Sequence, residues 1–104
     1  MTDQELAEIL TLTCEVDGLG NIKYRNSAGK KHRIHGPAVI WYDGGESWWL
    51  DGLRHRVGGP AQTWADGTQL WYQCGQMHRT DGPAAIHADG TKWWYKNGYE
   101  CNPG

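Results

Sequence analysis

Three His-Arg pairs are the residues of this sequence best suited to binding chemistry. His32-Arg33, His55-Arg56 and His78-Arg79 stand 23 residues apart. The planar guanidinium of each Arg can bind a phosphate or carboxylate with two parallel hydrogen bonds, and each His can add a donor. The same pairs could instead fix a link between elements, by bonding to Asp51, Asp81 or a carbonyl of the next turn. Both interpretations stay open at this point.

The spacing of these pairs argues against a metal site or an active site. Equivalent residues of successive hairpins lie about 9 to 10 Å apart, whereas zinc ligands converge at about 2 Å from one ion. The sequence also lacks Gly-x-Ser-x-Gly, His-Glu-x-x-His, Cys-x-x-Cys and a glycine-rich phosphate loop leading into a helix. We therefore expect no enzyme, no metal and no cofactor.

Aromatic residues are the second candidate for ligand contact. The chain has seven Trp and five Tyr but no Phe, and Trp and Tyr suit half-exposed binding surfaces because they carry a polar handle. Two columns of the repeat collect these rings: Trp41, Trp64 and, in third place, His87; and Trp48, Trp71 and Trp94. A base stacked on such a ring gains about 1 to 3 kcal/mol. A column of equivalent Trp residues can also be a packing ladder, and His87 a simple surface residue.

A ten-residue sequence motif surrounds each His-Arg pair and occurs three times. It runs from Gly29 to Ala38, from Gly52 to Ala61 and from Gly75 to Ala84, and ends each time in Gly-Pro-Ala. A fixed period of this length predicts a solenoid, in which each unit buries its apolar side chains only by stacking on its neighbours.

Each unit has the pattern of a β-hairpin. Strands are predicted at 38–42, 61–65 and 84–88, then Asp-Gly at 43–44, 66–67 and 89–90, then aromatic strands at 47–50, 70–73 and 93–96. Asp-Gly between extended runs favours a type I′ turn, which needs positive φ at both central residues. We expect one hairpin per unit, with the His-Arg and Gly-Pro residues as the link to the next.

The N-terminal part differs from the repeats. Thr2-Asp-Gln-Glu5 has the form of a capping box, so a short helix is predicted over about residues 3 to 9, followed by a strand at 10–16. We divide a single domain of residues 1–104 into a cap with the first strand (1–16), an irregular first hairpin (17–28) and regular repeats (29–104), the last one truncated. The predicted fold class is all-β: a single-layer stack of about four antiparallel hairpins with a short N-terminal helix or irregular cap.

The length of the Asp-Gly loops decides which side chains share a face. With a two- or four-residue loop, Trp41 lies opposite Glu46, and residues directly opposite share a face. Trp41, Trp48 and their equivalents then form one row open to a ligand, while the other face is apolar and buried under the N-terminal helix or a second subunit. A three-residue loop would place Trp41 and Trp48 on opposite faces.

The repeat resembles a divergent form of the MORN repeat, most of all in the short MORN-like proteins of bacteriophages and large viruses. The pattern Asp-Gly-x-x-x-Trp-x-x-x-Gly-x-x-His-Arg-x-x-Gly-Pro-Ala is similar to the MORN aromatic strand followed by Gly-x-x-His-Gly-x-Gly, and covers about residues 17 to 104. The resemblance implies a hairpin stack with an aromatic groove, used for protein contacts, self-association or binding of lipid headgroups. Here Arg33, Arg56 and Arg79 replace the second Gly of the usual His-Gly pair, which adds a cation to every link.

Composition bounds the partners. The formal net charge is −2, but residues 1–17 hold five acidic and no basic residues, so the remainder carries ten basic against seven acidic side chains, or +3. This mild charge argues against a dedicated binder of duplex nucleic acid and weakens headgroup binding at a membrane. No apolar run approaches the roughly 18 residues of a membrane span. Three cysteines without a close pair (Cys14, Cys74 and Cys101) favour a reducing compartment, and we expect a cytoplasmic protein, in the host cytoplasm if viral.

The sequence therefore predicts a non-enzymatic binding protein, by resemblance phage-encoded. It would capture an anionic, nucleotide-like small ligand through its Trp row and His-Arg pairs. The resemblance to small viral counter-defence proteins implies that the outcome is sequestration of a host immune signalling nucleotide. The residues expected at the ligand are Trp41, Trp48, Trp64, Trp71, Trp94, His87, Arg33, Arg56, Arg79 and His55. The alternative is a MORN-like protein–protein interaction module that inhibits or scaffolds a host protein. Open sheet edges, a thin core and the acidic N-terminus predict a homodimer or a higher homo-oligomer.

Overall fold

The computed structural model describes residues 12–101. Within this range the chain forms fourteen short strands and no helix, and every strand pair is antiparallel. The predicted all-β hairpin stack is therefore confirmed. The helix predicted over residues 3 to 9 and the first part of the strand predicted at 10–16 lie outside the described residues.

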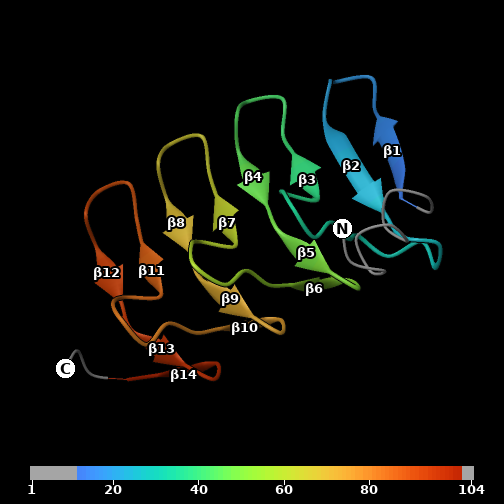
Figure 1. Cartoon of the computed structure of the whole chain (residues 1–104). Coiled ribbons are helices and arrows are strands. Elements are labelled where there is room, and N and C mark those ends of the chain that lie inside the picture. The colour runs from blue at the N-terminus through green and yellow to red at the C-terminus, as the bar shows by residue number, and fades with distance from the viewer. Residues whose placement is uncertain (1–11, 102–104) are drawn as a thin grey trace.

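Four hairpins form one eight-stranded sheet, in which the strands follow one another in chain order. Figure 1 shows these hairpins side by side, with their four loops at the same end of the stack. In order across the sheet the strands are β1 (Thr13–Val16), β2 (Ile22–Arg25), β3 (Val39–Ile40), β4 (Glu46–Ser47), β7 (Gln62–Thr63), β8 (Gln69–Leu70), β11 (Ala85–Ile86) and β12 (Lys92–Trp93).

A second row of smaller hairpins lies at the other end of the stack (Figure 1). It consists of β5 (Trp49–Leu50) with β6 (Leu53–Arg54), β9 (Tyr72–Gln73) with β10 (Gln76–Met77), and β13 (Tyr95–Lys96) with β14 (Tyr99–Glu100). Backbone bonds join neighbours sideways, since Arg56 donates to the Tyr72 carbonyl (3.1 Å) and Gly75 to the Arg54 carbonyl (2.8 Å). The expectation of one hairpin per repeat is wrong, because each regular repeat contains two.

The type I′ turns do not occur in the hairpins for which the sequence predicts them. Trp41 N–H donates to the Gly45 carbonyl (2.8 Å), which closes a three-residue loop over 42–44. In this loop Gly44 has φ 97°, and Asp43 is not a positive-φ residue. Two successive positive φ values occur instead at Asp51-Gly52 (48° and 81°) and at the equivalent pairs 74–75 and 97–98. The type I′ turns therefore close the small hairpins, where the chain has only two residues to reverse.

The loop length fixes the faces of the sheet. Ile40 lies opposite Glu46 and Val39 lies opposite Ser47, so the assumed pairing of Trp41 with Glu46 is wrong. Trp41 instead shares a face with Val39 and Ser47, while Trp48, one residue past Ser47, faces the other way. The physical reason is that only the glycine of the Asp-Gly pairs at 43–44, 66–67 and 89–90 takes the left-handed conformation, which adds one residue to the loop. The three-residue alternative, with Trp41 and Trp48 on opposite faces, is the one that the register supports.

The core is thin and made of small side chains. The buried apolar residues in the described range are Ala38, Val39, Ala61, Leu70, Ala84 and Ala85. Backbones approach closely there: Trp48 N–H donates to the Ala61 carbonyl at 2.6 Å and Trp71 N–H to the Ala84 carbonyl at 2.7 Å. With so little apolar area to bury, polar contacts between repeats must contribute to stability.

Candidate functional site

Each link holds its Arg against an aromatic ring that precedes it in the chain. The guanidinium carbon of Arg56 lies 4.0 Å from the centroid of the Trp48 ring. The equivalent pairs are Arg33 with Tyr24 (4.1 Å) and Arg79 with Trp71 (4.0 Å). Such cation–π contacts stabilise by about 0.5 to 2 kcal/mol, depending on how far the pair is removed from water.

The Gly-Pro of the link closes the other side of each guanidinium. A Cβ on Gly59 would lie only 2.9 Å from Cζ of Arg56, and Gly36 and Gly82 stand equally close to Arg33 and Arg79. The next residue completes the clamp, because Nη1 of Arg56 donates to the Pro60 carbonyl at 3.1 Å. The same bond joins Arg33 to Pro37 (3.3 Å) and Arg79 to Pro83 (3.1 Å). The glycine is required here because any side chain would displace the guanidinium.

The His of each pair fixes the next small hairpin. Nδ1 of His55 accepts the backbone N–H of Cys74 at 3.0 Å, and Cys74 has a positive φ of 51°. His32 accepts from Asp51 and His78 from Asn97 at the same distance. Nδ1 must carry a free lone pair to accept, so the ring proton of each neutral His is on Nε2. These contacts, with the bond of Arg79 to Asp81, confirm the interpretation that the pair fixes the link.

Grooves lie between successive links, at equivalent positions of the repeat. The central groove has a volume of about 420 Å³, and the grooves on either side measure about 220 and 300 Å³. Side chains of the central groove include Arg56, Trp71, Gln73, His78, Arg79 and Asp81. Trp48 and His55 line the groove beside Arg33, and Trp94 lines the groove beside Arg79 with Lys96 and Cys101.

The residues predicted at the ligand fall on two faces of the sheet. The grooves bring together Arg33, Arg56, Arg79, His55, Trp48, Trp71 and Trp94. Trp41, Trp64 and His87 lie on the opposite face, because they stand two residues beyond the equivalent strand residues Val39, Gln62 and Ala85 of that face. A single ligand therefore does not reach both Trp columns.

Charges in the central groove are partly compensated. Its charged side chains are Arg56, Arg79 and Asp81, and Asp81 accepts a hydrogen bond from Nε of Arg79 at 2.9 Å. This bond, and the positive charge of Arg79, lower the pKa of the Asp81 carboxyl from its ordinary value of 3.8. The groove therefore carries a net charge of +1 near neutral pH when His78 is neutral.

The opposite face carries a ladder of cations and rings. Nζ of Lys31 lies 4.7 Å from the Trp49 ring centroid, and the guanidinium of Arg54 lies between Trp49 (5.1 Å) and Tyr72 (5.3 Å). Burial lowers the pKa of Lys31, and the positive charges of Lys23, Arg25 and Arg54 lower it further. The ladder thus concentrates positive charge in the first two regular repeats.

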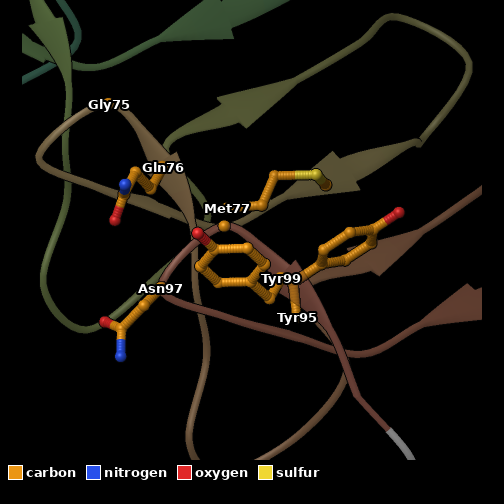
Figure 2. A pocket seen from close by; sticks show the side chains of 7 residues that line it. Gly75, Gln76, Met77, Tyr95, Asn97 and Tyr99 are labelled. Atoms are coloured by element: carbon orange, nitrogen blue, oxygen red, sulfur yellow. The ribbon is translucent and has the colours of Figure 1, made fainter.

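In the last repeat, Met77 stands at the position equivalent to that of Arg54 in this ladder. Figure 2 shows Met77 beside the rings of Tyr95 and Tyr99, with the amide side chains of Gln76 and Asn97 toward the other end of the same hollow. A second hollow of about 410 Å³ is lined by Tyr72, Met77, Trp93, Tyr95 and His87 among others. Sequence reasoning did not predict that these aromatic residues and Met77 form a surface. Of the signals in the sequence, only the three-residue length of the loops could have placed them beside His87.

No group of three or more His, Cys, Asp or Glu side chains arranged to hold a metal ion occurs within residues 12–101. No helix in the same range is long and apolar enough to cross a membrane. Comparison of the chain with protein-family models, with curated proteins and with solved structures finds no match.

Proposed function

We propose that this protein is a non-enzymatic binding protein that captures an anionic, nucleotide-like small ligand in the grooves between its links. The observation that supports it most is the clamped guanidinium of Arg56. Its face rests on Trp48 and its Nη1 atom is bonded to the Pro60 carbonyl. A cation held in this way loses little rotational freedom on binding, which favours affinity for an anion.

The central groove suits the size and chemistry of such a ligand. Its volume of about 420 Å³ falls within the roughly 300 to 1,000 Å³ of small-molecule sites. Arg56 would hold a phosphate, and Trp71 in the same groove would contact the base. Capture without turnover removes a ligand from solution. If the chain acts in a virus-infected cell, as the MORN-like resemblance implies, a host immune signalling nucleotide is the ligand whose sequestration would matter.

Isothermal titration and Trp fluorescence against a panel of cyclic and linear nucleotides test this proposal. We expect saturable binding by at least one nucleotide, with affinity reduced about tenfold or more by Arg56→Lys, because Lys cannot reproduce the planar fork. Trp64→Ala is the matched control, since Trp64 is on the opposite face; it should change the fluorescence but leave the affinity as it is. A panel without any response would contradict the proposal.

The opposite face supports a second candidate function, binding of a host protein. Large aromatic side chains are exposed there, with Trp64 48% and Trp93 42% accessible, and Trp is enriched among the residues that dominate protein interfaces. A pull-down with the purified chain tests it: one host protein should be retained by the natural chain and by Arg56→Lys, and lost by Trp64→Ala. Retention of that protein by Trp64→Ala would remove this face from consideration.

We also propose self-association into a homodimer or larger homo-oligomer. Within the described residues, β1 and β12 are the outermost strands of the eight-stranded sheet and pair on one side only. Glu15 lies on the first edge, where it is paired with Arg25 of β2, and Lys92 lies on the last edge. Sedimentation at micromolar concentration should show a dimer or a larger species, and a stable monomer would refute it.

A further inference from the structure

Arg56 and Arg79 are equivalent residues of successive links, and they differ in what is bonded to the Nε side of the guanidinium. In Arg79, Nε donates to Oδ1 of Asp81 at 2.9 Å, two residues further along the same link. In Arg56 the residue at the equivalent position is Gly58, which has no side chain to bind the guanidinium. Both guanidinium groups are otherwise held alike, at 4.0 Å from a Trp ring and bonded through Nη1 to a Pro carbonyl at 3.1 Å.

An Arg can bind an oxyanion with two parallel bonds through its Nε–Nη2 edge or through its Nη1–Nη2 edge. In Arg56 and Arg79 the Nη1 atom is already bonded to a Pro carbonyl, which leaves the Nε edge. At Arg79 a carboxylate of the chain itself is already on that edge. At Arg56 no acceptor within residues 12–101 is bonded to Nε, and the space where a side chain of residue 58 would begin is open to 4 Å. Arg56 and Gly58 both line the central groove.

We propose that Arg56 is the anion seat of the central groove and that Asp81 keeps Arg79 from being a second one. The ligand group is a two-oxygen oxyanion edge, as on a terminal phosphate or a carboxylate. Asp81 shows where that group is placed, because its carboxylate occupies the equivalent position in the next repeat. This inference rests on the proposed function, and it narrows the two Arg residues of the central groove to the one that can take the charged end of a ligand.

The charges of the groove are compatible with this assignment. Asp81 also lines the central groove, but its charge is paired with Arg79 in direct contact. A tethered carboxylate two residues away has a high effective concentration at Arg79, so a free anion at millimolar concentration competes poorly with it. Among residues 12–101, no side chain competes for Arg56 in this way.

Nitrogen-15 NMR of the Arg Nε–H signals in the full chain tests the inference with inorganic phosphate as the probe. The signals of Arg56 and Arg79 are assigned by Arg56→Lys and Arg79→Lys. With ionic strength held constant by sodium chloride, we expect phosphate to shift the Arg56 signal saturably and to leave the Arg79 signal unmoved. A parallel titration with acetate separates phosphate from carboxylate preference, because both present the required oxygen edge.

Asp81→Gly supplies the decisive variant, since the second link already folds with Gly at this position. It should make the Arg79 signal respond to phosphate, so that both Arg residues of the central groove respond. Equal responses of Arg56 and Arg79 in the natural chain, or no response of Arg56, would overturn the inference. An unchanged Arg79 response in Asp81→Gly would overturn the role of Asp81.

The result is distinguishable from the fate of the proposed function. If phosphate shifts Arg56 but no nucleotide binds, the anion seat stands and the nucleotide proposal fails. If a nucleotide binds and the Arg56 Nε–H signal does not move, the nucleotide proposal stands and Arg56 is not the seat.

Discussion

The guanidinium carbon of Arg56 lies 4.0 Å from the centre of the Trp48 ring, and this contact joins the link to the residue between β4 and β5. The same stacking recurs at the neighbouring links. An Arg side chain that the sequence alone suggests as a ligand-binding group thus also stabilises the structure of the repeat. Each Arg has one face in packing, one nitrogen in a backbone bond and one edge that remains available unless the chain itself occupies it.

Gly59→Ala should destabilise the protein by about 0.5 to 2 kcal/mol, because the flexible Arg side chain can move away from the added methyl group but then loses its cation–π contact. The added Cβ would lie 2.9 Å from Cζ of Arg56 and 3.0 Å from Nη1, so the guanidinium must leave the Trp48 ring. Urea unfolding measures the loss, and Trp fluorescence reports the separation of the ring from the cation.

Gly18→Ala is the matched control for this substitution. Gly18 has nothing within 4 Å of the Cβ position and no positive φ, so the change should alter stability by less than about 0.5 kcal/mol. Equal effects of Gly18→Ala and Gly59→Ala would show that the clamp on Arg56 does not contribute to stability.

Thr68→Val should destabilise the stack by about 1 to 3 kcal/mol, because it leaves a backbone donor without its acceptor. Thr68 is 2% accessible, and its hydroxyl accepts the N–H of Ala88 from the next hairpin at 3.2 Å. The side chain keeps its shape in Val, so the change tests the hydrogen bond between repeats rather than the packing. Thermal unfolding followed by circular dichroism measures it.

The repeat offers its own control at Thr91, which is exposed and lies at the end of the loop between β11 and β12. Thr91→Val should lower the melting temperature much less than Thr68→Val. Were the two variants equally destabilised, the bond from Ala88 to Thr68 could not be the reason.

The hairpin stack was predictable because its determinants are local. Gly-Pro and Asp-Gly punctuate the chain every 23 residues, and turn residues act over only a few positions. Even the role of the His-Arg pair as a link could be inferred, because the pair travels with Gly-Pro. The bond between His55 and Cys74 is the particular form that this role takes.

The faces of the sheet were not predictable with the same certainty, because a single residue of loop length inverts them. Asp43-Gly44 satisfies the sequence pattern of a two-residue type I′ turn, yet the chain forms a three-residue loop. Arg56 and Trp48 lie on either side of the β5–β6 hairpin, and no local pattern encodes their contact. Sequence reasoning therefore identified the groove residues but assigned Trp41 and Trp64 to the wrong side of them.

Cys74→Asn should stabilise the protein by about 0.5 kcal/mol. Cys74 is held at φ 51° as the first residue of a two-residue turn with Gly75, and Asn adopts this conformation more readily than Cys. The equivalent pair in the last repeat is already Asn97-Gly98. The midpoint of urea unfolding should rise without a change in slope.

Cys74→Ser separates backbone preference from loss of the thiol, whose Sγ lies 3.8 Å from Nδ1 of His55. We expect no stabilisation in this variant. A gain as large as that of Cys74→Asn would mean that the thiol itself is unfavourable at this position.

The carboxyl of Asp81 should titrate below its ordinary value of 3.8, because the bond from Arg79 and the charge of that residue lower its pKa. A depressed pKa in the folded state means that ionised Asp81 stabilises the native protein above pH 3.8 and that this contribution is lost as the pH falls through the folded pKa. Carbon-13 NMR of the carboxyl group measures the titration directly. In Arg79→Met, which keeps an unbranched chain over Trp71, the pKa of Asp81 should rise toward 3.8. The pKa of Asp89 is lowered by the backbone N–H of Thr91 instead, so it should stay where it is. If Arg79→Met left the titration of Asp81 unchanged, Asp81 would not be paired with Arg79 in solution, and the outer edge of Arg79 would be as open to an anion as that of Arg56.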